Sequence, residues 1–143
     1  MSLTVRPVDT THIQQVWPMV EHFIQEALDK GGDFPDWAAS YNASHVQAYL
    51  ASGQWTLLVA TDEESKIHGA MTISFINYPL HRVAFVTTTG GKFIANPELL
   101  EQLKALVKLH GATKIQAYCR ESMVRLLARA NFEPRNTLVE VLV

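Results

Sequence analysis

The side chains that could bind a metal ion or attack a substrate give the first indication of chemistry. A single cysteine, Cys119, has no second thiol with which to form a disulfide or a zinc site. We therefore expect a reducing compartment. The histidines show no pair at metal-ligand spacing with a suitable acid, so the sequence predicts no metal site. These histidines are His12, His22, His45, His68, His81 and His110.

Composition limits the classes of protein to consider. The chain has 143 residues, of which 48% are hydrophobic and 18% charged, enough for one buried core, so we predict a single domain over residues 1–143. A net charge of −2 offers no basic surplus for phosphates, which argues against a nucleic-acid partner. No apolar run approaches the ~20 residues that cross a bilayer, and no signal-peptide pattern opens the chain. We expect a cytoplasmic protein without a membrane partner.

The elements that must position any site follow from apolar spacing. The pattern predicts the order β-α-α-β-β-β-α-β-α-β, a mixed α/β sheet with helices on both faces, because crossovers give parallel strands and a meander gives antiparallel ones. Pro18 should kink or break the first helix. The predicted strands are Leu3–Pro7, Trp55–Ala60, Ile67–Phe75, Arg82–Thr88, Lys114–Cys119 and Thr137–Val143. The predicted helices are Ile13–Leu28, Asn42 or Ser44 to Gly53, Asn96–Gly111 and Ser122–Ala130.

The same spacing predicts the core and one exposed edge. The terminal strand Leu138–Val143 has no polar tail that would protect it, so we expect the chain to form a homo-oligomer through it. The predicted core comprises Val16, Val20, Ile24, Leu58, Ile73, Phe85, Leu103, Leu106, Ile115 and Leu127.

Three short sequence segments in the second half of the chain occur in an order that can be compared with known families. They are Leu99-Leu100 early in a helix, His110-Gly111-Ala112 before a strand, and Ala130-Asn131-Phe132-Glu133-Pro134 after the last helix. With the element order, they resemble the GCN5-related N-acetyltransferase (GNAT) superfamily, in which an acyl-CoA gives its acyl group, usually to an amine. The resemblance implies acetyl-CoA as the acyl donor and an amine, on a small molecule or a peptide, as the acceptor.

The resemblance also implies a loop that holds the CoA pyrophosphate with backbone N–H groups at a helix start. The family pattern is Arg or Gln, two residues, Gly, one residue, then Gly or Ala, and the residues before Leu99 do not keep it. The alternative interpretation makes Gly90-Gly91 a turn and Lys92 a solvated charge. The cofactor residues implied are Val86, Thr87, Thr88, Gly90, Gly91, Lys92, Ala95 and Asn96.

Acid–base groups are implied less directly. Leu127 occupies the position where the family commonly has the tyrosine that protonates the leaving thiolate. The substitutes are Tyr118, Cys119 and Ser122, each of which also has an ordinary structural role. No acid lies on the strand Arg82–Thr88, so His81 is the first candidate for a base that takes the proton from the amine. The next candidates for this base are Asp33, Asp36 and Glu21.

By analogy with the family, the aromatic loop would form the wall of the site that contacts the acceptor substrate, here called the acceptor wall. It contains Asp33, Phe34, Trp37 and Tyr41 and would lie beside a groove between the strands Arg82–Thr88 and Lys114–Cys119.

The leading interpretation is an acyl-CoA-dependent N-acyltransferase, because such catalysis depends mainly on positioning and backbone donors. The competing interpretation is a GNAT-like binding or assembly module without acetyl transfer, as in a compact viral or mobile-element genome. An unrelated α/β fold of similar order is a third interpretation.

Overall fold

The structure is a computed structural model that describes residues 2–30, 40–93, 96–141 and 143. Its strands are β1 (Thr4–Val8), β2 (Thr56–Thr61), β3 (Ile67–Asn77), β4 (Arg82–Gly91) and β5 (Lys114–Ala117). Its helices are the 3-10 turn η1 (Thr10–His12), α1 (Ile13–Asp29), α3 (Ala43–Ala51), α4 (Pro97–Leu109) and α5 (Glu121–Ala128).

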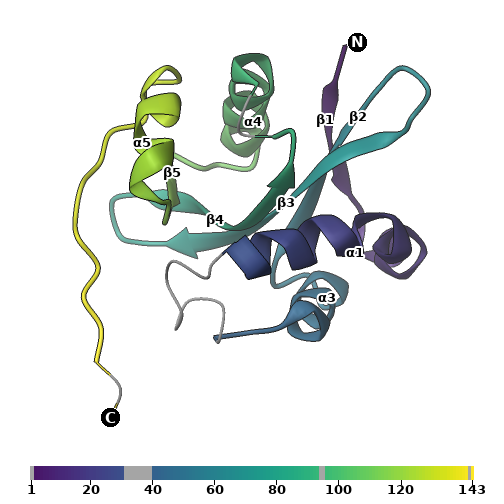
Figure 1. Cartoon of the computed structure of the whole chain (residues 1–143), viewed down its shortest axis with the longest axis horizontal. Helices are drawn as coiled ribbons and strands as arrows, with labels where there is room; N and C mark the ends of the chain where they lie inside the picture. The colour runs from purple at the N-terminus through teal and green to yellow at the C-terminus, as the bar shows by residue number, and fades with distance from the viewer. Residues whose placement is uncertain (1, 31–39, 94–95, 142) are drawn as a thin grey trace.

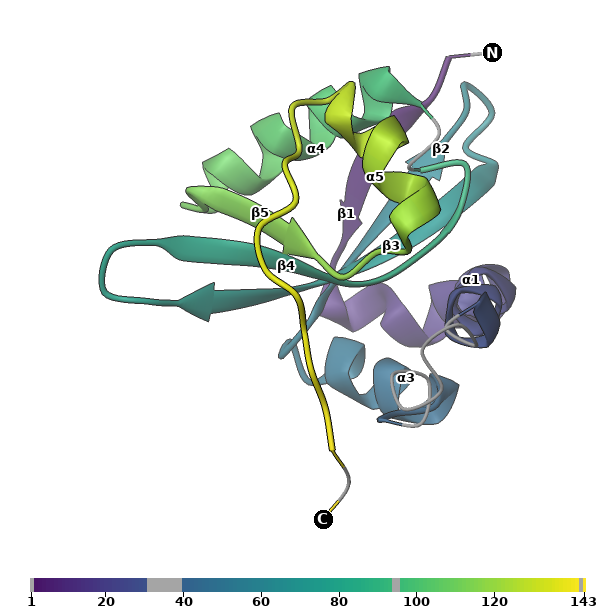
Figure 2. The ribbon, with the colours of Figure 1, turned by 60° about the vertical axis from the view of Figure 1, so that its left-hand side comes forward.

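The strands form one mixed sheet in the order β1-β2-β3-β4-β5. The first four are antiparallel to their neighbours, whereas β5 is parallel to β4. A parallel pair needs a crossover connection, and α4 supplies it. Figures 1 and 2 show α1 and α3 on one face of the sheet and α4 and α5 on the other. The predicted mixed sheet with helices on both faces is confirmed.

Two hydrophobic clusters hold these layers together, one on each face of the sheet. Successive β2 residues alternate between them: Leu57 and Val59 pack with α1 and α3, and Leu58 and Ala60 pack with α4 and α5. This is the two-residue period of a strand that is covered on both sides. Of the predicted core, Val20, Ile24, Leu58, Ile73, Leu103 and Leu127 are buried, while Val16, Phe85, Leu106 and Ile115 are half-buried.

The predicted terminal strand Thr137–Val143 is wrong. Residues 137–141 and 143 are exposed and belong to no strand, and Figure 1 shows the chain running from α5 to an end beyond the body of the molecule. Residues of high strand propensity form a strand only where a neighbouring strand takes their backbone hydrogen bonds. No strand among the described residues does so for this segment.

Two details differ from alternatives that the sequence offered. Of the kink or break expected at Pro18, the structure excludes the break, because α1 continues through the proline and its buried stripe of Trp17, Val20 and Ile24 spans it. Burial of that stripe outweighs the one backbone hydrogen bond that Pro18 removes. Gly90 and Gly91 are the last residues of β4, so they do not form a turn.

Candidate functional site

The candidate site lies where two parallel strands separate. The last pair between β4 and β5 is Val86 with Ala117. β4 nevertheless continues to Gly91, still paired with β3 on its other side. Beyond Val86, no strand among the described residues pairs with β4 on the side of β5. Backbone groups of β4 that face this side are therefore left for another partner.

A β-bulge in β4 occurs at the same point. Thr72 of β3 pairs with Thr88, but the next residue, Ile73, pairs with Val86. Thr87 is therefore an extra residue in β4. A bulge bends its strand and increases the local twist. β4 therefore changes direction next to its last residue pair with β5.

Three buried threonine hydroxyls hold the bulge. The Thr72 Oγ1 lies 2.6 Å from the Thr87 Oγ1 and 2.7 Å from the Thr88 Oγ1, and the Thr87 hydroxyl donates to the Thr72 carbonyl at 3.0 Å. Each hydroxyl has one proton to donate and lone pairs to accept. These contacts satisfy the three buried side chains, so the threonines act here as structural residues that fix the shape of β4.

Tyr41 joins the segment before α3 to this bulge. Its hydroxyl donates to the Thr87 carbonyl at 3.0 Å. Burial raises the pKa of Tyr41 to about 12, so its phenol is neutral at physiological pH. Its ring meets Trp55 edge-on, with centroids 5.2 Å apart. The structure thus brings Tyr41, predicted for the acceptor wall, to the predicted cofactor residue Thr87.

The start of α4 does not offer the open donors expected of a phosphate-binding helix. Asn96 Oδ1 accepts from Glu98 N–H at 2.9 Å and from Leu99 N–H at 3.4 Å. Pro97 has no N–H, and the Leu100 N–H bonds the Asn96 carbonyl at 3.3 Å. Glu98 also puts a carboxylate at the positive end of the helix dipole. Asn96 is therefore the cap of α4, and its side chain already accepts hydrogen bonds from two of these donors.

Gly90 and Gly91 have a packing role that the sequence alone does not reveal. A Cβ on Gly90 would collide with the backbone carbonyl of Phe23 in α1. A Cβ on Gly91 would lie 2.5 Å from the His68 carbonyl oxygen and 2.7 Å from the Gly69 Cα. Gly91 also has a φ of 76°, which favours glycine. Both positions need glycine so that α1 and β3 can pack closely, whether or not a ligand binds.

The remaining predicted cofactor residues differ in exposure. Val86, Thr87 and Thr88 are buried, and Lys92 is exposed. The Lys92 backbone N–H donates to the His68 carbonyl of β3 at 3.1 Å. Four predicted residues, Ala95, Asp33, Phe34 and Trp37, and the reserve base Asp36, lie outside the described residues.

The structure does not bring His81 to the other predicted catalytic residues. His81 Nδ1 lies 2.8 Å from the Thr113 Oγ1, just before the first residue of β5. Tyr118 follows the other end of that strand. His81, just before β4, precedes Thr87 by six positions, which corresponds to roughly 20 Å at ~3.3 Å per residue. His81 thus lies at the far end of the sheet from the bulge. The reserve base Glu21 is an exposed residue of α1.

Tyr118 lies at the strand separation, since it directly follows Ala117 of the last β4–β5 pair. Its ring meets Phe85 edge-on at 5.2 Å. Leu127 is buried in the core, as expected, and supplies no proton. Burial raises the pKa of the neighbouring Cys119 thiol, which makes its thiolate scarcer. Of the predicted acids, Tyr118 is the one placed beside the separating strands.

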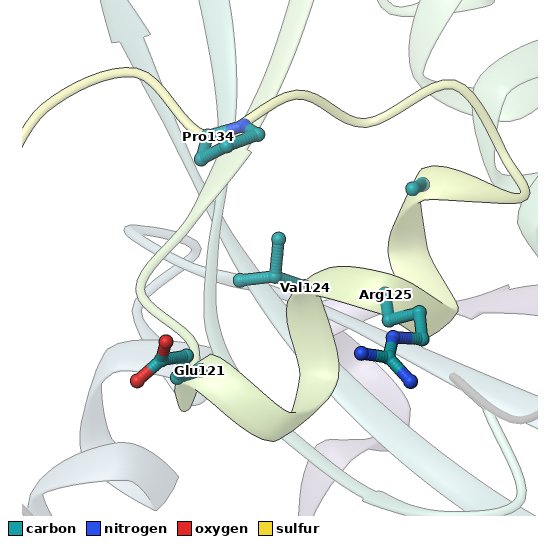
Figure 3. Close-up of a pocket in the computed structure, with 5 residues that line it drawn as sticks. Glu121, Val124, Arg125 and Pro134 are labelled. Atoms are coloured by element: carbon teal, nitrogen blue, oxygen red, sulfur yellow. The ribbon is translucent and has the colours of Figure 1, made fainter.

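Ser122 lies on the first turn of α5, where it lines a shallow surface hollow with Glu121 and Arg125. A neighbouring hollow continues along the helix to Pro134, and Figure 3 shows Val124 and Pro134 on its two sides. α5 begins at Glu121 and its N-cap is Arg120, so Ser122 lies inside the helix and does not cap it.

Thr72 is the site residue that sequence reasoning missed. It is fully buried at the bulge, yet it lies in a strand whose neighbours are apolar. The available signal was a threonine between the apolar residues Met71 and Ile73 of β3, together with the consecutive threonines Thr87 and Thr88 in β4. A buried polar side chain needs a hydrogen-bond partner, and each strand supplies the partner of the other.

Known proteins resemble this chain in structure rather than in sequence. No protein-family model and no curated protein matches the sequence. A GCN5-related N-acetyltransferase from Ralstonia eutropha JMP134 is 14% identical, with 99% of each chain covered and a TM-score of 0.65. An aminoglycoside acetyltransferase from an uncultured soil metagenomic sample is 16% identical, with 100% of this chain and 99% of the other covered and a TM-score of 0.67.

The chain has the GNAT fold. A further structure with this fold is a predicted acetyltransferase with acetyl-CoA from Clostridium acetobutylicum, 14% identical over 99% of this chain and 96% of the other, with a TM-score of 0.60. The GNAT fold accounts for the parallel β4 and β5 at the centre of the candidate site. At these identities the likeness establishes the fold and leaves the activity to be argued from the site.

Among the described residues, no three His, Cys, Asp or Glu side chains gather as a metal site would require. In the same part of the chain, no helix combines the length and apolar character of a membrane span.

Proposed function

We propose that this chain is an acyl-CoA-dependent N-acyltransferase with acetyl-CoA as donor and an amine, on a small molecule or a peptide, as acceptor. The observation that carries the proposal is the bulge at Thr87 beside the last β4–β5 pair. Beyond this point β4 and β5 no longer pair, which leaves backbone groups of β4 without a strand partner on that side. In the proposed complex the thioester lies beside this part of β4, with its carbonyl oxygen facing β4 N–H groups.

The reaction needs little beyond this geometry. The neutral amine nitrogen attacks the thioester carbonyl carbon, the C–S bond breaks, the new amide nitrogen releases one proton to solvent, and the CoA thiolate takes one proton as it leaves. Positioning the two reactants removes most of the entropic part of the barrier. Tyr118 is the proposed proton donor, because it directly follows the last residue of β5 that pairs with β4.

Replacing Tyr118 with phenylalanine tests this assignment, because the ring against Phe85 is kept and only the hydroxyl is lost. We expect Tyr118→Phe to bind acetyl-CoA as the wild type does while kcat falls about 100-fold, the lower range for general acid catalysis. Calorimetric titration and thiol release with a panel of amines measure the two effects. The matched control is Tyr78→Phe, in the exposed β3–β4 connection. An unchanged kcat in Tyr118→Phe would remove the tyrosine from the mechanism.

The capped start of α4 favours a second candidate function, a GNAT-like binding module without acetyl transfer. The donors that would hold a pyrophosphate are bonded to Asn96, and Glu98 adds a negative charge there. The same calorimetric titration separates the two functions. Saturable binding of acetyl-CoA supports the enzyme, and an absence of heat at millimolar acetyl-CoA supports the module.

A further inference from the structure

The connection between β3 and β4 projects from the body of the molecule. β3 continues to Asn77 and β4 begins at Arg82, whereas the first pair between β4 and β5 is at Val83. The Tyr78 N–H donates to the His81 carbonyl at 2.7 Å and closes a tight turn. Figure 2 shows this hairpin extending past β5 on one side of the molecule. The residues of the turn are therefore held away from the core.

Apolar side chains are exposed at this projection. In the hairpin tip, which comprises residues 78–80, Leu80 is 89% exposed. Leu109, the last residue of α4, is also largely exposed. The Arg82 Nε donates to the His110 carbonyl at 3.0 Å, which ties the base of the hairpin to the end of α4. The hairpin tip and the end of α4 thus form one end of the molecule, here called the hairpin end.

Positive charge surrounds these apolar side chains. Lys108 is in the last turn of α4, Lys114 is the first residue of β5, and both are exposed. Neither side chain forms an ion pair with a described residue. Residues 65–97 and 102–120, which contain the hairpin, the end of α4 and β5, include no Asp or Glu. The hairpin end is therefore positively charged, although the chain as a whole has a net charge of −2.

A group of acidic residues lies at the other end of β3. The turn before β3 contains Asp62, Glu63 and Glu64, and both figures show it on the opposite side of the molecule from the hairpin tip. The 11 residues of β3 separate the two turns by roughly 36 Å at ~3.3 Å per residue. Residues 1–64 contain nine acidic and two basic residues, whereas residues 65–143 contain five and ten. Near a negatively charged surface, this asymmetry turns the hairpin end toward the surface.

We propose that the hairpin end binds the surface of an anionic lipid bilayer. Leu80 and Leu109 enter the interfacial region, Tyr78 lies at the headgroup level, and Lys108 and Lys114 meet the negatively charged headgroups. A bilayer admits a projecting apolar tip without a matching groove, which a protein partner would have to supply. The sequence argued against a membrane partner from the lack of a spanning segment, and a surface contact needs none. This inference does not depend on the proposed acyl transfer.

Vesicle sedimentation is the first test. We expect the wild type to bind vesicles of equal parts phosphatidylserine and phosphatidylcholine at low ionic strength, and to dissociate at high ionic strength. It should not bind vesicles of phosphatidylcholine alone. Inorganic phosphate should release it no better than sodium chloride of the same ionic strength. No binding to the anionic vesicles, equal binding to both kinds, or release specific to free phosphate would overturn the proposal.

Single substitutions of exposed residues separate the two kinds of contact. Lys114→Ala should weaken vesicle binding about fivefold, because one cation near an anionic surface is lost. Leu80→Ala should weaken it about tenfold, because apolar burial in the bilayer is lost. The matched controls, Lys66→Ala in the turn before β3 and Met19→Ala on α1, are also exposed and should bind as the wild type does. Unchanged binding in both test variants, or equal losses in the controls, would contradict a contact through the hairpin end.

A fluorescent label identifies the end that enters the bilayer. In a Cys119→Ser background, Leu80→Cys and Lys66→Cys each provide one cysteine for an apolar, environment-sensitive fluorophore. We expect the emission to shift to shorter wavelength on vesicle binding at position 80 and to stay unchanged at position 66. Polyglutamate, a substitute for an acidic protein partner, should shift neither label. A shift at position 66, or a shift at position 80 with polyglutamate and not with vesicles, would overturn the proposal.

Discussion

At the scale of single residues, Tyr41 has the clearest part in the site. Its hydroxyl donates to the carbonyl of the bulged residue Thr87, and its pKa is raised to about 12 by burial. A phenol that stays neutral well above physiological pH is suited to hold a carbonyl and poorly suited to exchange protons. We therefore interpret Tyr41 as a positioning residue that maintains the bulge.

Tyr41→Phe should lower the free energy of unfolding by about 1 kcal/mol at neutral pH, because the hydrogen bond to Thr87 is lost. The pKa in the folded state is above the ordinary value of 10.0, so the contribution of the phenol is complete below pH 10 and is lost between pH 10 and 12. Urea unfolding at pH 9 and pH 11 should thus show the gap between wild type and variant shrinking. The exposed Tyr78→Phe is the control. A gap that grows with pH would contradict the assignment.

Gly90 is the residue at which the smallest substitution should have a large effect. The added Cβ in Gly90→Ala meets backbone of α1, which cannot rotate away, so we expect a loss of about 1–3 kcal/mol in stability. Lys92→Ala, two residues later and exposed, should change stability by less than about 0.5 kcal/mol. Thermal unfolding of both variants measures this contrast. A Gly90→Ala variant as stable as the wild type would contradict the packing role of this glycine.

At the scale of elements, α4 shows how sequence signals and tertiary burial agree. The cap at Asn96, Pro97 at the first position and the stripe through Leu103 all predict the helix that forms. Leu103 is 1% exposed, whereas Leu109 on the same helix is 84% exposed. Leu103→Ala should cost roughly 2–5 kcal/mol in urea unfolding, and Leu109→Ala under about 0.5 kcal/mol. Similar losses in both variants would mean that the buried stripe of α4 is misassigned.

The elements that the sequence predicts well are those with their own local signals. Apolar periodicity and caps locate α1, α3 and α4, and alternation in the meander locates β2, β3 and β4. The segment Thr137–Val143 has the same local signal as a strand, but pairing depends on a neighbour that local sequence does not contain. The strand prediction failed here because the segment has no neighbouring strand to pair with. Its residue propensities favour a strand as strongly as those of the strands that form.

The site is less predictable than the fold for a related reason. The pattern placed His81 just before the strand that contains Thr87, yet it did not show at which end β4 separates from β5. The bulge depends on the register between β3 and β4, which a single sequence does not display. Thr72, on β3, became part of the site only through that register.

At the scale of the whole molecule, the GNAT fold brings β4 and β5 together and then parts them at Val86. Mapping acetyl-CoA onto the backbone amides by NMR tests the central proposal most directly. Saturable shifts should concentrate at Thr87, Thr88 and Tyr118, beside the separating strands, and leave His81 and Thr113 at the far end unchanged. An absence of shifts at millimolar acetyl-CoA, or shifts confined to the far end, would contradict an acyl-CoA site between these strands.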